Sequence, residues 1–441
     1  MTERRKILFI SYAYPPVAGG GAARVVRWTM TIHQAGFQPV VVTIKNAYQR
    51  GRDLSYLKEI EAVARIERTG SLDLKRVVYV LGSYWARFRR KKRDNSSTAS
   101  HAEPRASETW RRLWSFLQAL RNWFMVPDDL ILWLPFALWR SWRLIKKERP
   151  ALVITSSWPQ SVQLTGLLVK KLFGIPWLVD FRDNWARHPY YAYPTRFHRA
   201  LATLMEKWVV GNADLVTLAY GCKDFARVYP QWRNKFRELT NGFRESDVAG
   251  ARPRAMEGFK LVYLGAFYGA HTPAGFFHAL RQLTQSHPEV KPDLKVWMVG
   301  QFYPEHFALA EKYGVADLVN FHPFVPHSEI FNWLVTADAL LLFLGGTAEA
   351  AVVPGKVFEY IRSPAWILAM IPEGETADIL RAAGGALIVP FNQSEKIEEA
   401  ILQLYQYWKK GEKPERIRKY VMSKEEDYLR GKMVEFINSL I

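Results

Sequence analysis

The chain has 441 residues, 49% of them hydrophobic and 23% charged, so it is no globally disordered protein, and its length exceeds what one hydrophobic core usually supports. With 61 Lys and Arg against 42 Asp and Glu, the net charge of +19 favours an anionic partner: nucleic acid, a phosphate-rich substrate or an acidic membrane surface. The single cysteine, Cys222, excludes an internal disulfide.

The N-terminus carries cations before an apolar run, as a secretory signal does. Only four apolar residues follow Lys6, whereas a signal needs about 7–15, so we expect a buried strand here. The longest apolar run, 130–139, contains Pro135 and is shorter than the roughly 20 residues of a spanning helix. We therefore expect no transmembrane segment.

The first half of the chain has the pattern of a parallel α/β domain. A strand at 6–11 precedes a loop rich in Pro and Gly, a helix at 22–35 and an apolar strand at 39–44. The pattern resumes with a strand at 151–155, a helix at 160–172, and strands at 177–181 and 215–218. Such βαβ units predict a sheet of parallel strands.

The second half repeats this pattern. We expect strands at 260–264, 294–299, 339–344, 366–369 and 386–390. Two successive series predict an α/β fold with two Rossmann-like domains, at 1–245 and 246–441. The polar segment 245–258 is the expected linker between them.

A basic, Trp-rich insertion interrupts the first domain at about 84–124. It holds ten Lys and Arg against three acids, with four tryptophans between them, and an amphipathic helix with Trp133, Trp139 and Trp142 follows. Three interpretations remain for residues 84–147: nucleic-acid binding, attachment to an anionic membrane, or a solvated insertion beside ordinary packing.

The segment 352–361 is the strongest local signal of a binding site. It follows a predicted strand and a Gly-rich turn, and Gly355 and Lys356 stand where a helix should begin, which favours anion binding. Glu359 lies one turn later and could accept hydrogen bonds from a ribose diol. Periodicity alone favours a simpler alternative, an amphipathic helix with both charges solvated.

The glycines at 19–21 also raise the possibility of a dinucleotide site. The fingerprint G-x-G-x-x-G would place a third glycine at position 24, where Arg24 stands, and no acid ends the second strand. An oxidoreductase is therefore disfavoured. The sequence also lacks the spacing of a zinc site, a P-loop or a nucleophile elbow.

Several segments together resemble the retaining glycosyltransferases of family 4, which have the GT-B fold of two Rossmann-like domains facing across a cleft. They are the Pro- and Gly-rich residues 15–21, and 180–185, 240–243, 354–360 and 374–377. The resemblance implies a nucleotide-sugar donor bound by the C-terminal domain, an acceptor bound by the N-terminal domain, and no bound metal or other cofactor.

The resemblance also implies roles for particular residues. Glu359 matches a ribose-binding Glu, Gly355 and Lys356 lie in the segment under the donor, and Val325 lies in the loop that meets the nucleobase. The remaining donor-binding candidates are Gly19, Gly20 and Gly21 in the N-terminal loop, and Gly265 after the first strand of the donor domain.

Two features depart from the family pattern. Many members have a second Glu eight residues before the ribose Glu, where this chain has Ala351, and Glu349 is two residues out of register. The loop 266–271 lacks the usual Arg and Lys. Lys356, the start of the helix that carries it, and Arg24 or His271 are left to bind the diphosphate.

Stabilising the charge that develops on the leaving diphosphate lowers the barrier to transfer, and no pair of carboxylates at hydrolase spacing is needed. Asp183 is the catalytic candidate, positioning the acceptor hydroxyl or accepting its proton. The alternative for residues 180–183 is an ion pair at a strand end, while His188 is more simply a loop residue.

We thus expect a retaining glycosyltransferase, hexosyl or related, that moves a sugar to a glycan or lipid-linked acceptor in bacterial cell-surface polysaccharide synthesis. It would be cytoplasmic and peripheral on the inner face of an anionic membrane, without a nucleic-acid partner. The alternatives are a non-hydrolysing sugar-nucleotide epimerase and a non-catalytic, membrane-attached glycan-assembly protein.

Overall fold

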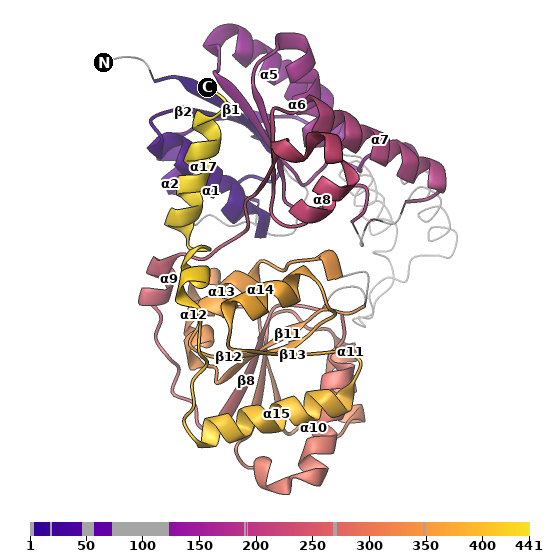
Figure 1. Ribbon diagram of the computed structural model, residues 1–441, viewed down its shortest axis with the longest axis vertical. Coiled ribbons are helices and arrows are strands. Elements are labelled where there is room, and N and C mark those ends of the chain that lie inside the picture. The colour runs from indigo at the N-terminus through magenta and orange to yellow at the C-terminus, as the bar shows by residue number, and fades with distance from the viewer. Residues whose placement is uncertain are drawn as a thin grey trace, which may run out of the picture. The chain divides into compact units, whose positions relative to one another are not determined.

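A computed structural model describes residues 4–17, 20–45, 57–72, 123–188, 191, 193–267, 271–346 and 350–441. By its contacts the chain divides into two compact units (Figure 1). Unit 1 comprises Met1–Leu239 with Lys432–Ile441, and unit 2 comprises Thr240–Gly431. This boundary precedes the predicted one at residue 245, and residues 432–441 group with the first unit although they were expected in the second.

Unit 1 is built on a seven-stranded parallel sheet with the order β3-β2-β1-β4-β5-β6-β7. Its strands are β1 (Lys6–Ile10), β2 (Gln38–Ile44), β3 (Arg65–Thr69), β4 (Leu152–Ser156), β5 (Trp177–Phe181), β6 (Leu215–Leu218) and β7 (Phe236–Glu238). Its helices are α1 (Gly20–Gln34), α2 (Leu57–Val63), α5 (Leu134–Glu148), α6 (Ser161–Phe173), α7 (Arg196–Asn212) and α8 (Cys222–Val228), with short 3₁₀ turns at Ile131–Trp133 and Pro230–Lys235.

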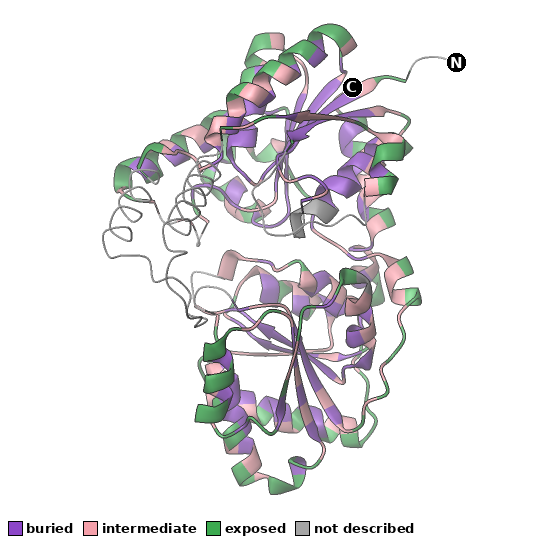
Figure 2. Ribbon diagram, turned by 180° about the vertical axis from the view of Figure 1, so that it is seen from behind, coloured by how far each residue is buried: buried purple, intermediate pink, exposed green. Residues whose placement is uncertain are grey.

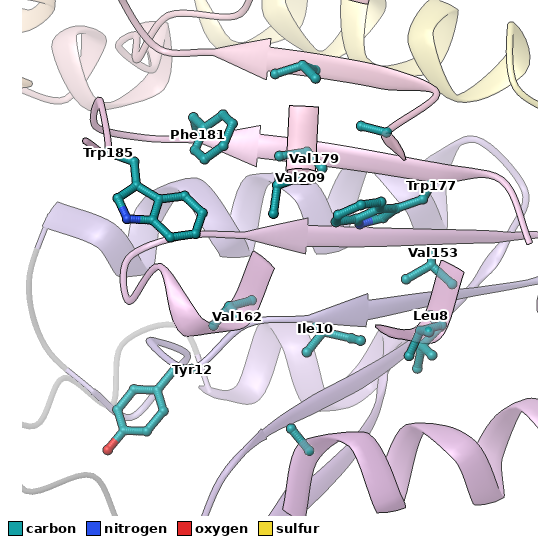
Figure 3. Packing of buried hydrophobic residues seen from close by; sticks show 14 of the residues in the cluster. Leu8, Ile10, Tyr12, Val153, Val162, Trp177, Val179, Phe181, Trp185 and Val209 are labelled. Carbon is teal, nitrogen blue, oxygen red and sulfur yellow. The ribbon is translucent and has the colours of Figure 1, made fainter. Parts of the chain in front are cut away.

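The core of unit 1 follows from the composition of its strands. β1, β2, β4, β5 and β6 are almost wholly buried, as expected for parallel strands covered by helices on both faces. Ile10, Val153 and Val179 lie on neighbouring strands and pack with the indoles of Trp177 and Trp185 (Figure 3). This core fixes the positions of the loops at the carboxyl ends of the strands.

Unit 2 has a six-stranded parallel sheet with the order β10-β9-β8-β11-β12-β13. Its strands are β8 (Phe259–Leu264), β9 (Leu294–Val299), β10 (Val319–His322), β11 (Ala339–Phe343), β12 (Trp366–Met370) and β13 (Ala386–Val389). Its helices are α9 (Glu245–Ala249), α10 (Ala274–Ser286), α11 (Pro304–Lys312), α12 (His327–Thr336), α13 (Lys356–Arg362), α14 (Glu375–Ala383), α15 (Ser394–Lys409) and α16 (Arg418–Met422), with a 3₁₀ turn at Pro288–Val290. The boundary between the units falls within α17 (Glu426–Asn438).

All the predicted strands are present within a residue or two of the expected limits, whereas β3, β7 and β10 were not foreseen. The expected linker 245–258 proves to be an integral part of unit 2. Glu245 bonds Arg362 of α13, and the backbone N–H of Arg254 donates to Thr336 of α12. Because its polar composition serves these contacts, the segment is not a free connector.

Most of the basic insertion, residues 84–122, lies outside the described residues. The amphipathic helix predicted after it is α5, which buries Ala137, Ser141 and Leu144 and exposes Trp139 and Trp142. No helix in the described ranges is both long and apolar enough to cross a membrane.

Candidate active site

Unit 2 brings several predicted donor residues to one place in its sheet. From β8 the connections run outward to β9 and β10, and from β11 they run the other way to β12 and β13. Ligands of open parallel sheets bind at such a switch point, beyond the carboxyl ends of the strands. Gly265 directly follows β8, and Lys356 and Glu359 lie on α13, the helix between β11 and β12.

Lys356 reaches from α13 to the end of β8. Its ammonium donates to the carbonyl of Leu264 at 2.8 Å and lies 4.3 Å from the centre of the Tyr263 ring. Burial lowers the pKa of this half-buried lysine to about 8, opposed by the nearby charge of Glu359. An ammonium has three N–H donors, and the Leu264 contact uses one.

Gly265 is required by this arrangement. Its φ of +140° is unfavourable for other residues, and an added Cβ would lie 2.8 Å from the Lys356 Nζ. Any side chain would therefore displace the ammonium or the backbone. The residue predicted to lie in a donor loop thus has a definite structural task in positioning Lys356.

Glu359 has a partner that was not foreseen. Its Oε1 lies 3.0 Å from the Nε2 of His327, the first residue of α12. The hydrogen bond to Glu359 is the largest of the causes that raise the pKa of His327; Asp247 acts in the same direction, and burial and Arg244 oppose it. The signal in the sequence was a histidine directly after the predicted nucleobase loop.

These contacts contradict the simpler interpretation of α13 as a helix with two solvated charges. The Glu359 side chain is only 18% exposed, and Lys356 bonds the end of a neighbouring strand. However, α13 has seven residues, so its N-terminus contributes little as an anion site, and the chemistry lies with the side chains.

The predicted nucleobase loop lies between β10 and α12. Val325 is buried, whereas the ring of Phe324 is 76% exposed. The buried Val325 anchors the loop while Phe324 extends into solvent. An exposed aromatic ring can offer a stacking surface to a base, and the prediction for this loop, which concerned its backbone, gave the Phe324 side chain no role.

The segment before α13 is fixed by the start of α14. Thr376 donates to the carbonyl of Val352 at 2.7 Å, and a Cβ on Gly374 would lie 2.0 Å from the carbonyl oxygen of Ala350. Position 351, where the family pattern has a second Glu, therefore lies on a well-packed segment. Glu349 lies outside the described residues.

The N-terminal glycines are described only in part. Gly20 and Gly21 begin α1, and Gly19 lies outside the described residues. Arg24, four residues into this helix, was considered for the diphosphate, and that expectation is wrong. Its buried guanidinium bonds both carboxylate oxygens of Asp180, at 2.9 and 2.6 Å, and the carbonyl of Leu239.

Asp180 and Asp183 have different roles. Asp180 is fully buried and accepts from Ser156 and Thr217 as well as Arg24, which lowers its pKa in spite of burial. The ion-pair interpretation is therefore confirmed for Asp180. Asp183 follows β5 and accepts a hydrogen bond from the Tyr220 hydroxyl at 3.0 Å.

Titratable groups gather around Asp183. Burial lowers the pKa of His188, opposed by the charge of Asp183, and raises the pKa of Tyr191 well above its usual range. Asp183 thus lies among two tyrosines and a histidine beyond the carboxyl end of β5, where an acceptor hydroxyl could be oriented. Its catalytic role stays a prediction.

No group of three His, Cys, Asp or Glu side chains in the described ranges has an arrangement that would hold a metal ion.

Comparison with known proteins relates this geometry to a family. Residues 19–219 match the model of a glycosyl transferase 4-like domain. Among solved structures, sucrose-phosphate synthase from Thermosynechococcus elongatus has a TM-score of 0.62 at 15% identity, with 99% of each chain covered. Anabaena Alr3699/HepE in complex with UDP-glucose has a TM-score of 0.58 at 11% identity, covering 99% of this chain and 100% of that one.

WaaG, a glycosyltransferase involved in lipopolysaccharide biosynthesis, has a TM-score of 0.55 at 15% identity, covering 98% of this chain and 99% of WaaG. A UDP-N-acetylglucosamine 2-epimerase is also similar, with a TM-score of 0.52, 12% identity, and 99% and 95% coverage. The curated proteins contain no sequence match. At such identities the structural likeness shows the fold alone, which is GT-B.

The family match includes the segment around Asp183, and the fold similarity covers nearly the whole chain, including α13 with Lys356. Residues 19–219 are thus similar to a glycosyl transferase 4-like domain, and the chain has the GT-B fold over its whole length.

Proposed function

We propose that the protein is a retaining glycosyltransferase that moves a sugar from a nucleoside-diphosphate sugar to a glycan or lipid-linked acceptor in cell-surface polysaccharide synthesis. One observation carries this proposal: Lys356 and Glu359 lie one turn apart on α13, and the Lys356 ammonium reaches the end of β8 at the switch point of the sheet. A cation and a carboxylate in this arrangement suit a diphosphate and a ribose diol.

Each group then has a task in the chemistry. The Lys356 ammonium, with N–H donors beyond the one on Leu264, stabilises the charge that develops on the leaving diphosphate. Glu359 accepts from the ribose hydroxyls and so fixes the position of the nucleotide. Phe324, between β10 and α12, offers its exposed ring to the base.

In unit 1, Asp183 is proposed to orient the acceptor hydroxyl. The Tyr220 hydroxyl bonds its Oδ1 and holds the carboxylate in one orientation. In a retaining transfer the acceptor approaches on the leaving-group side, so the departing diphosphate accepts the acceptor's proton. Protein side chains supply the charge stabilisation, and we propose that neither a metal nor another cofactor is needed.

The epimerase alternative is favoured by one observation, the fold similarity to a UDP-N-acetylglucosamine 2-epimerase. An epimerase would alter the donor without an acceptor, whereas a transferase consumes it only when an acceptor is present. A scaffold protein would bind no nucleotide at all.

The experiment that separates these functions has two stages. Thermal unfolding against a panel of nucleoside-diphosphate sugars identifies the donor, because a ligand that binds the folded state raises its stability. NMR of the reaction products with that donor then follows the anomeric carbon, with and without a lipid-linked or glycan acceptor. Retained configuration in an acceptor-dependent product supports the proposal; a free epimer, or no stabilisation by any donor, contradicts it.

We also propose a peripheral location on the cytoplasmic face of an anionic membrane. One reason for this location is the composition of residues 84–124, which have a net charge of +7 and four tryptophans. Most of these residues lie outside the described ranges. Within the described part, α5 adds the exposed Trp139 and Trp142 and the exposed cations Arg143, Lys146 and Lys147. Such composition suits a headgroup region rich in acidic lipid.

A further inference from the structure

Helix α7 exposes an apolar stripe to solvent. Phe197, Leu204 and Trp208 are 71%, 41% and 52% exposed. At positions i, i+7 and i+11 they lie along one side of the helix. The opposite side of α7 packs into unit 1 through Ala202, Val209 and others, so the stripe is not part of the core. Figure 2 shows buried and exposed sides alternating along this helix.

Three cations of α7, Arg196, Arg199 and Lys207, are exposed. Helical spacing places Arg196 and Lys207 on one flank of the apolar stripe, and Arg199 lies farther round the first turn of the helix. The one acid in α7, Glu206, is 1% exposed and accepts from the Tyr229 hydroxyl at 2.6 Å and from Arg187. The outer side of α7 is therefore positively charged, with no exposed acid in the helix to balance it.

The apolar stripe continues onto the last two residues of the insertion, Trp123 and Phe124, which the structure describes. The Nε2 of the buried His198 lies 2.9 Å from the carbonyl oxygen of Trp123, and its ring contacts both Trp123 and Phe197. Trp123 and the adjacent Phe124 are 51% and 69% exposed. These two residues, with Phe197, Leu204, Trp208 and the three cations of α7, form what we call the α7 surface.

We propose that the α7 surface docks the protein on an anionic lipid membrane, with the aromatic side chains among the headgroups and acyl boundary and the cations on the lipid phosphates. Aromatic residues beside Arg and Lys on one side of a helix suit this interface. The proposal rests on the peripheral membrane location proposed above and extends it to α7, a helix beyond residues 84–147 that Trp123 and Phe124 adjoin. It does not depend on the reaction catalysed.

Charge argues against a second copy of the chain as the occupant. In a symmetric dimer the same patch meets itself, so the three cations of one copy would face those of the other without an exposed acid on either helix. Nucleic acid would match the cations, but a continuous stripe of Phe197, Leu204 and Trp208 has no counterpart along a phosphate backbone.

Sedimentation with vesicles of phosphatidylcholine, with or without phosphatidylglycerol, tests the proposal. Each Lys or Arg near an acidic surface contributes about fivefold to partitioning. Replacing Arg196, Arg199 and Lys207 with Gln should therefore weaken binding to the acidic vesicles by up to about 100-fold. The matched control replaces Lys312, Lys396 and Lys413, exposed cations of unit 2, with Gln. It removes the same charge and should bind as the unaltered protein does.

A second variant, with Phe197→Ser and Trp208→Ser, separates the apolar contribution. It should lose the part of the binding that persists in high salt, because salt screens charges but not apolar insertion. Both side chains are more than half exposed, so thermal unfolding of this variant should match that of the unaltered protein.

Because the insertion is also basic, a local probe is needed. Cys222 is the only cysteine, so Leu204→Cys in a Cys222→Ser background takes one environment-sensitive fluorophore on the α7 surface. A blue shift on acidic vesicles supports the proposal. Sedimentation without a shift at position 204, equal loss of binding in the unit 2 control, or binding to heparin but not to acidic vesicles overturns it.

Discussion

The two units have the same strand order around their central strands, yet they use charge near the carboxyl ends of those strands in opposite ways. In unit 1, Arg24 and Asp180 are both buried and bonded to each other, and Asp180 also accepts from Ser156 and Thr217. In unit 2, the half-buried Lys356 bonds a single backbone carbonyl and lies over the ring of Tyr263.

This difference separates structure from function. A cation whose donors are met by a buried carboxylate stabilises the fold and is not available to a ligand. A cation that one carbonyl and an aromatic ring hold in place still has N–H donors with which it can bind a ligand. We therefore assign the Arg24–Asp180 pair of unit 1 to stability and the Lys356 ammonium of unit 2 to the donor, and the predictions below test this assignment.

The largest effect is expected in unit 1. Arg24→Met leaves the Asp180 carboxylate buried without its countercharge, and loss of one partner from a buried pair costs about 3–5 kcal/mol. Denaturant unfolding should show this loss in the transition of unit 1, and calorimetry should show unchanged nucleotide affinity. The double variant Arg24→Met/Asp180→Leu should recover much of the stability. Reduced nucleotide affinity in a folded Arg24 variant would contradict the comparison.

The second effect belongs to the donor site. Glu359→Ala should weaken nucleotide binding by about 1.5–3 kcal/mol, the scale of hydrogen bonds to a charged group. Isothermal titration calorimetry measures it, with Glu311→Ala, an exposed acid on α11, as the matched control. Equal affinities for all three proteins, with the fold intact, would remove Glu359 from the site.

The third prediction concerns Gly265, whose backbone lies against the Lys356 ammonium. Gly265→Ala should lower stability by about 1–2 kcal/mol because of its positive φ, and it should also weaken donor binding because its Cβ would displace Lys356. Gly314→Ala is the control, since Gly314 has a φ of +66° and open space around its Cβ position. The assignment is supported if both variants lose similar stability but only Gly265→Ala binds the donor more weakly. It is contradicted if the two variants bind the donor with equal affinity.

A smaller effect should follow pH. The pKa of His327 is raised in the folded protein, so the His327–Glu359 pair stabilises the fold fully below the unfolded pKa of about 6.5. That contribution is lost as the pH rises through the folded pKa. His327→Gln should therefore have a lower Tm than the unaltered protein at about pH 6 and the same Tm at about pH 9. A constant difference across this range would show that the pair does not titrate as described.

The smallest expected effect is that of metal removal. If Lys356 and neighbouring donors stabilise the diphosphate, turnover should survive EDTA unchanged. Activity that EDTA abolishes and Mg²⁺ or Mn²⁺ restores would show that protein groups alone do not carry the charge in unit 2.

The sequence predicted much of the fold because the strands are local signals. A parallel strand covered on both sides must be a short apolar run, and runs such as 39–44 and 339–344 can be recognised without knowing their neighbours. β3, with the sequence Arg-Ile-Glu-Arg-Thr, lacks such a run, since it pairs only with β2 at the edge of the sheet. Its charges bond Glu148 and Arg140 instead.

The sequence by itself thus determined the two α/β domains and the segment of α13 that carries Lys356 and Glu359, because periodicity and a Pro-Gly-Lys helix start are properties of neighbouring residues. Only the tertiary structure decided which charges meet. Arg24 and Asp180 are 156 positions apart, and His327 and Glu359 are 32 apart. Whether a cation is neutralised in a core or left with donors for a ligand depends on such distant contacts, which the packing of helices on the sheet creates and no local pattern specifies.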